Sequence, residues 1–104
     1  MLAVLEEKRP ALAELCRRFG VRKLELFGSA ATGDFNPIRS DLDFIVEFPP
    51  DYDFGPWLSR LTKFKRRLAE LFGRRVDLVM PSALRNSWFR REAAKTRVTL
   101  YQTF

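Results

Sequence analysis

The chain has 104 residues, 46% of them apolar, and a net charge of +6. We expect one folded domain over residues 1–104, because this length is typical of a single domain. The only cysteine is Cys16 and histidine is absent, which excludes an internal disulfide, His-based nucleophilic triads and His-ligated zinc. The positive charge favours an anionic partner: a nucleotide, a nucleic acid or an acidic protein.

No apolar run approaches the length of a membrane span, and no signal-peptide pattern is present. We therefore expect a cytoplasmic protein with no membrane partner.

The stretch "EEKRPALAELCRRFG" predicts the first helix. Apolar residues recur at spacings of three and four, acidic residues lead, arginines follow and Gly20 ends the pattern. Pro10 is unfavourable in a helix interior. We expect it either in the first turn or at a boundary that separates off a short segment, residues 2–8.

Two strands follow, as indicated by alternating apolar residues. "VRKLELFG" predicts a strand that ends at Gly28, with Leu24 and Leu26 on one face. "LDFIVEF" predicts a second strand with two distinct faces. Its apolar face has Leu42, Phe44, Val46 and Phe48, and its other face has Asp41, Asp43, Ile45 and Glu47.

A loop, "PPDYDFGP", precedes a strongly amphipathic helix over residues 57–72. Its apolar stripe is predicted to comprise Trp57 or Leu58, then Leu61, Phe64, Leu68 and Leu71. The basic residues away from that stripe are Arg60, Lys63, Arg66 and Arg67. A solvated face is the favoured interpretation of these charges, ahead of nucleic-acid contact.

"RRVDLVM" predicts a third strand, with Asp77 on the face opposite Val76, Leu78 and Met80. A last helix is expected from Ser82 to about Lys95, and "RVTLY" is consistent with a short final strand. This order predicts an α/β or α+β fold, with helices covering a small sheet.

The two carboxylates at the start of the second strand are the candidate metal-binding residues. Asp41 and Asp43 are two residues apart on a strand, so they project from one face at a spacing of about 6.6 Å. Neighbouring carboxylates repel each other unless a cation lies between them, and oxygen ligands alone suit Mg²⁺ or Mn²⁺. If the strands are neighbours, Asp77 could bind the same metal or accept a proton from an attacking hydroxyl.

The turn after the first strand is suited to binding phosphate. Gly28 allows a ligand to approach the backbone closely, and a helix starting at Ser29 would direct free N–H groups at an anion. We also assign Ser40 to the nucleotide-binding residues, as a group that braces the loop rather than as a nucleophile.

The chain combines a Gly-Ser turn, a spacer, Asp-x-Asp on a strand and a third Asp on a later strand. This combination resembles the nucleotidyltransferase superfamily that includes DNA polymerase beta. "LFGSAATGD", "SDLDFIVEF", "RRVDLVM" and a final "LY" are similar to its minimal (MNT) branch. The resemblance implies a polymerase beta-like fold with a small mixed sheet, Mg²⁺ or Mn²⁺ on Asp41, Asp43 and Asp77, and Asp77 as base. It also implies attack of an acceptor hydroxyl on the α-phosphorus of ATP, with release of pyrophosphate.

Proteins of this branch are typically encoded beside a HEPN-domain ribonuclease toxin. The resemblance therefore implies an antitoxin that transfers AMP to a tyrosine of that toxin. One alternative is an antitoxin that acts by binding alone, because Thr32 stands where the family commonly has arginine. A second alternative, motivated by the positive charge, is an RNA-modifying nucleotidyltransferase.

Overall fold

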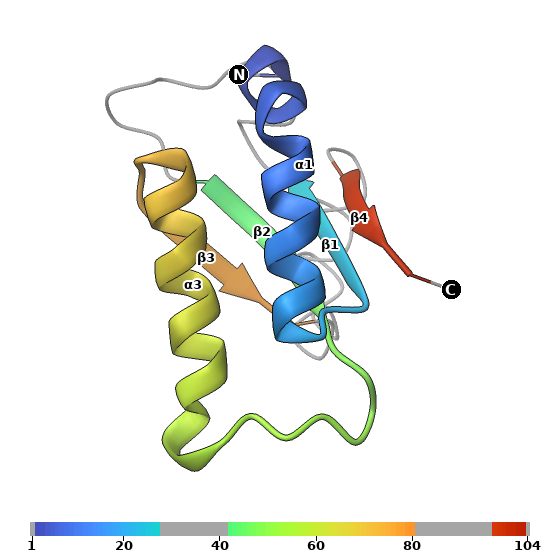
Figure 1. Cartoon of the computed structure of the whole chain (residues 1–104), viewed down its shortest axis with the longest axis vertical. Helices are drawn as coiled ribbons and strands as arrows, with labels where there is room; N and C mark the ends of the chain where they lie inside the picture. The colour runs from blue at the N-terminus through green and yellow to red at the C-terminus, as the bar shows by residue number, and fades with distance from the viewer. Residues whose placement is uncertain (1, 28–41, 81–96, 104) are drawn as a thin grey trace, which may run out of the picture.

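The computed structural model describes residues 2–27, 42–80 and 97–103. The four strands of these ranges form one mixed sheet in the order β3-β2-β1-β4 (Figure 1). Strand β1 is antiparallel to both β2 and β4, whereas β2 and β3 are parallel. This arrangement confirms the predicted fold class. The elements in chain order are α1 (Leu2–Phe19), β1 (Lys23–Phe27), β2 (Leu42–Glu47), η1 (Pro56–Leu58), α3 (Ser59–Phe72), β3 (Val76–Val79) and β4 (Val98–Gln102).

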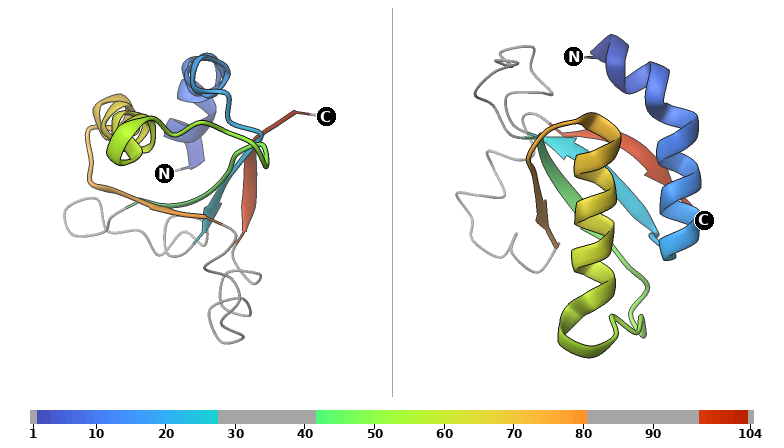
Figure 2. Two further views of the ribbon diagram at one scale, coloured as in Figure 1. Left: turned by 90° about the horizontal axis from the view of Figure 1, so that it is seen from below. Right: turned by 60° about the vertical axis from the view of Figure 1, so that its left-hand side comes forward.

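Helices α1 and α3 lie on the same face of the sheet, as the left view of Figure 2 shows. The core lies between these two layers. The sheet contributes the apolar residues that the alternation predicted, among them Leu24, Leu26, Leu42, Phe44 and Val46, all 0% exposed. The other face of the sheet is therefore the one that bears the side chains of Asp43 and Asp77.

Helix α3 connects the two parallel strands. A parallel pair needs a crossover of this kind, and the crossover places β3 directly beside β2. The helix packs on the sheet through Phe64, Leu68 and Phe72, and it ends at Gly73, which has a φ of 65°. The left-handed conformation of Gly73 turns the chain toward β3 at little steric cost.

Pro10 is the first point at which the sequence-based prediction is wrong. Helix α1 is continuous from Leu2 to Phe19 and contains Pro10 in its interior. A proline there costs about 3 kcal/mol, since one helical hydrogen bond is lost. Leu5 and Leu12, on either side of it, are 2% and 1% exposed. Burying two leucines contributes about 1.5–3 kcal/mol each, which offsets that cost.

The start of α3 also differs from the prediction. Trp57 is 98% exposed and Leu58 is 50% exposed, so neither belongs to the buried stripe. Both have positive φ angles, 55° and 58°, and regular α-helix begins only at Ser59. At this end of the core the aromatic rings of the preceding loop pack together instead: Phe48 stacks on Tyr52 and meets Phe54 edge-on.

The predicted final strand is confirmed as β4. The last predicted helix, from Ser82 to about Lys95, lies outside the described residues. In the described ranges, no helix is both long and apolar enough to cross a lipid bilayer.

Candidate functional site

Asp43 and Asp77 are register partners on the parallel strands β2 and β3. Adjacent strands are about 4.8 Å apart, and partners in register point to the same side of the sheet. On the other side of β2, Asp43 is opposite Phe27, the last residue of β1. Phe27, Asp43 and Asp77 therefore form one row across three strands, and the chain leaves β1 and enters β2 at this same end of the sheet.

The two carboxylates differ in their surroundings. Asp43 is half-buried in the centre of the row, whereas Asp77 is exposed on an edge strand of the described sheet. Asp77 also lines a groove of about 320 Å³, together with Arg66 and Arg75. The pair thus has one sheltered member suited to holding a cation and one accessible member that incoming groups can reach.

The donor chemistry of this pair suits a divalent cation. Mg²⁺ is commonly bound by one or two carboxylates, with waters and substrate phosphates completing its coordination. The described residues provide two such carboxylates on adjacent strands. They contain no cluster of three His, Cys, Asp or Glu side chains. Asp41, Gly28, Ser29 and Ser40 lie outside the described residues, so their assignment stays a prediction.

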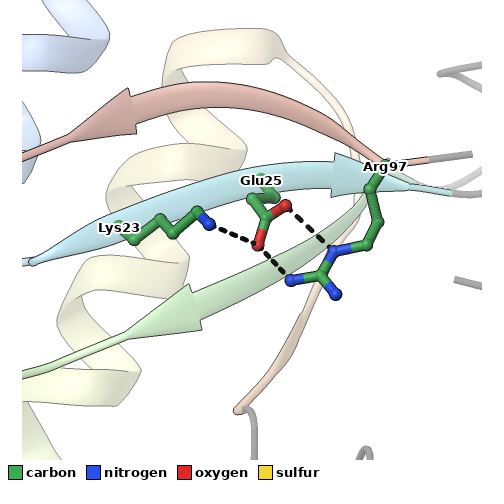
Figure 3. Close-up of polar contacts among 3 residues, drawn as sticks. All are labelled: Lys23, Glu25 and Arg97. Atoms are coloured by element: carbon green, nitrogen blue, oxygen red, sulfur yellow. Dashed lines mark hydrogen bonds and ion pairs between the residues drawn. The ribbon is translucent and has the colours of Figure 1, made fainter. Parts of the chain in front are cut away.

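A partly buried ion cluster on the same face was not predicted from the sequence (Figure 3). Glu25 is only 5% exposed. Arg97 donates two hydrogen bonds to its carboxylate, from Nε to Oε2 at 2.9 Å and from Nη2 to Oε1, and Lys23 Nζ lies 3.7 Å from Oε1. The hydrogen bonds to Glu25 raise the pKa of the Arg97 guanidinium above its usual value.

The strand alternation placed Glu25 on the same face as Asp43, and that was the one available signal for this cluster. Its partner Arg97 is 72 residues away along the chain, so local pattern alone could not pair them. Glu25 pairs with Ile45, two residues along β2 from Asp43. The ion cluster is thus adjacent to the aspartate row.

Residues 9–101 match the family model of the nucleotidyltransferase domain. The chain belongs to this family. Over 73 residues it is 40% identical to the protein adenylyltransferase MntA of Thermococcus cleftensis, an alignment that covers 70% of this chain and 69% of the relative. The predicted family and the predicted enzyme class are both confirmed: this chain is a nucleotidyltransferase.

Solved structures place this nucleotidyltransferase in the minimal branch. One, described provisionally as a minimal nucleotidyltransferase, superposes with a TM-score of 0.73 and 31% identity, over 93% of both chains. Another comes from a complex of a tri-AMPylated HEPN toxin of Shewanella oneidensis with an MNT antitoxin. It superposes with a TM-score of 0.61 and 20% identity over 95% of this chain and 73% of the other, which is evidence of a shared fold.

Proposed function

We propose that this nucleotidyltransferase transfers AMP from ATP to a tyrosine hydroxyl of a HEPN ribonuclease toxin, and so acts as its antitoxin. The observation that carries the proposal is the register of Asp43 with Asp77, which puts two carboxylates side by side on the face of the sheet away from α1 and α3. The similarity to MntA, and the AMPylated HEPN toxin in the complex of a structural neighbour, support the choice of AMP and of this partner.

In the proposed site, Asp43 and Asp77, with Asp41, would hold Mg²⁺ or Mn²⁺. The metal would supply positive charge against the ATP phosphates. Gly28, Ser29 and Ser40 would bind the triphosphate. The exposed position of Asp77 makes it the candidate base, because an acceptor hydroxyl can approach it directly.

The transfer step is a displacement at phosphorus. The tyrosine oxygen forms a bond to the α-phosphorus of ATP while the bond from that phosphorus to the bridging oxygen breaks. The hydroxyl proton passes to Asp77 and pyrophosphate leaves with the electron pair. Catalysis then consists mainly of positioning and charge neutralisation.

An AMP group on the toxin would inhibit it for two physical reasons. It adds bulk, and it adds negative charge where the phosphates of RNA must bind. The net charge of +6 on this chain suits a partner that presents an acidic or nucleotide-bearing surface.

The experiment that tests this function combines the protein with the HEPN protein encoded beside it, ATP and Mg²⁺. Intact mass should show additions of about 329 Da, the mass of AMP less water, on the HEPN protein. The additions should disappear with Asp43→Asn and persist with Asp51→Asn, an exposed aspartate outside the row.

Each alternative function has its own result in this experiment. If the two proteins bind and the toxin is silenced without a mass change, the chain is an antitoxin that acts by binding alone, as Thr32 suggests. Labelled nucleotide on RNA instead of the HEPN protein would favour an RNA-modifying nucleotidyltransferase. Either result would overturn protein AMPylation.

A further inference from the structure

We propose that Arg97 contacts the polyphosphate of the bound nucleotide, and that Glu25 holds its guanidinium in place for that contact. The inference rests on the proposed nucleotide site and adds a residue to it. Three observations carry it: the register of β4, the two hydrogen bonds from Arg97 to Glu25, and the guanidinium donors that Glu25 does not use.

A bulge in β4 determines where Arg97 lies. Leu24 pairs with Tyr101, but Glu25 pairs with Thr99, so one residue of β4 is left over at this point. In a regular ladder, Phe27 would be opposite Val98 and Arg97 would lie past the end of β1. With the bulge, Val98 pairs with Leu26 and Arg97 comes one step later, opposite the end of β1. Bulges are frequent next to active sites, where they redirect a side chain.

This shift also selects the face of the sheet. Residues that follow each other along a strand point to opposite faces. Val98 is level with Leu26, whose side chain is in the core, so Arg97 is level with Phe27 and shares the face of Asp43. Figure 3 shows its side chain crossing β1 on that face to reach Glu25. Arg97 thereby extends the row of Phe27, Asp43 and Asp77 by one strand.

Glu25 fixes the position of Arg97. A buried carboxylate needs a cationic partner, and Arg97 with its two hydrogen bonds supplies it. Lys23 lies near the same carboxylate but is opposite Glu47 on β2, and the negative charge of Glu47 also acts on Arg97. The cluster therefore has two cations and two carboxylates, so the fixed position of the guanidinium, and not a surplus of charge, is what favours a contact with phosphate.

Glu25 uses only part of the Arg97 guanidinium. The Nε and Nη2 atoms bond to Glu25, and Nη1 contacts no acceptor among the described residues. The Arg97 side chain as a whole is 31% exposed. Two strand spacings, about 10 Å, separate its backbone from Asp43. An extended arginine and a triphosphate chain together span that distance, and the guanidinium fork matches phosphate oxygens well.

The simplest alternative role for the cluster is structural: it links β1 to the start of β4. Both roles predict that loss of Arg97 lowers stability, because it leaves a buried carboxylate poorly paired. They differ for Glu25→Gln. Glutamine keeps an acceptor oxygen for Arg97 and raises the positive charge of the cluster, so a phosphate contact should survive that change.

The test measures nucleotide affinity by calorimetry, with thermal melting of each variant as the companion measurement. Arg97→Met should weaken Mg²⁺·ATP binding about 10- to 100-fold, as expected for a charge-assisted contact. It should change AMP binding less than about threefold. Glu25→Gln should keep ATP binding within about threefold of the parent although it melts earlier. The matched control is Arg18→Met, an exposed arginine of α1 on the helical side, which should bind ATP as the parent does.

Two results would overturn the inference. If Arg97→Met binds ATP as tightly as the parent, the cluster only links β1 to the start of β4, and the proposed function stands. The same conclusion follows if Arg97→Met and Glu25→Gln lose equal affinity, in proportion to the fall in their melting temperatures. If Arg97→Met does not fold, Arg97→Gln replaces it, since glutamine can still bond to Glu25. A parent protein that binds no Mg²⁺·ATP would instead refute the proposed function, and this inference with it.

Discussion

Asp43 and Asp77 lie side by side on two adjacent parallel strands, although they are 34 residues apart in the sequence. The pairing depends on α3, whose crossover returns the chain beside β2 in the same direction. The register of one helix-linked strand pair therefore sets the spacing of the two carboxylates. A shift by one residue would turn Asp77 to the helical face.

Replacing Asp77 with asparagine should separate activity from stability. The side chain is exposed, so the free energy of unfolding should change by less than about 0.5 kcal/mol. The proposed AMP transfer should slow by roughly 100-fold or more, because Asp77 is its proposed base and metal ligand. Urea unfolding and pyrophosphate release measure the two effects. Asp51→Asn is the control, and a transfer rate equal in both variants would remove Asp77 from the site.

Truncation of the core under α3 should destabilise the protein strongly. Leu68 is 0% exposed, and Leu68→Ala leaves a cavity that should cost about 2–5 kcal/mol of unfolding free energy. Lys65→Ala, on the exposed side of the same helix, should change it by less than about 0.5 kcal/mol. The urea midpoint distinguishes them. Similar midpoints would mean that α3 does not pack on the sheet as described.

Local pattern was sufficient to predict most of this fold. The alternation in β1 and β2 identified the core face, because every second side chain of a strand points to the same face of the sheet. It failed where distant contacts outweighed local preference. The burial of Leu5 and Leu12 keeps α1 continuous through Pro10. Trp57 does not belong to the apolar stripe of α3, because the backbone is not helical at this residue.

The candidate site was predictable to a similar extent. Asp43 and Asp77 could be paired from sequence once their strands were assumed to be neighbours. Arg97 could not, since its place depends on a bulge and on a partner far away in the chain. No local pattern encodes such a register shift.

The left-handed backbone at Leu58 offers a stabilising substitution. A non-glycine residue with a φ of 58° carries strain of about 1–2 kcal/mol, and the Leu58 side chain is half exposed. Leu58→Gly should therefore raise the free energy of unfolding by up to about 1 kcal/mol. Leu61→Gly, inside α3, should lower it by about 1 kcal/mol or more. Chemical denaturation measures both, and a loss of stability in Leu58→Gly would contradict the strained backbone.

Cys16 should make stability fall at alkaline pH. Burial raises the pKa of its thiol from 9.0 to about 12. Between these values the unfolded chain loses the thiol proton while the folded chain keeps it. Unfolding is therefore favoured as pH rises through this range, by up to about 1.4 kcal/mol per pH unit.

The measurement for Cys16 is unfolding free energy from pH 8 to 11, compared with Cys16→Ala. The alanine variant is less stable at pH 8 because of the lost packing, and its stability should fall less steeply above pH 9. If stability falls equally steeply with pH in the parent and in Cys16→Ala, the raised pKa of the buried thiol is contradicted. Thiol reagents at pH 8 should also modify the folded parent only as fast as it opens.

The pairing of β1 with β4 has a consequence for how the protein is made. β1 holds residues 23–27 and β4 holds residues 98–102, so this part of the sheet forms only when a long loop of chain closes. During translation, β1 and β2 can associate first, but Arg97, the partner of Glu25, is synthesised 72 residues after it. A ribosome paused before that point would present a sheet with an unpaired edge and a buried acid without its arginine. Such a nascent chain is a target for chaperones and proteases, so the yield of folded nucleotidyltransferase would depend on the rate at which ribosomes pass position 97.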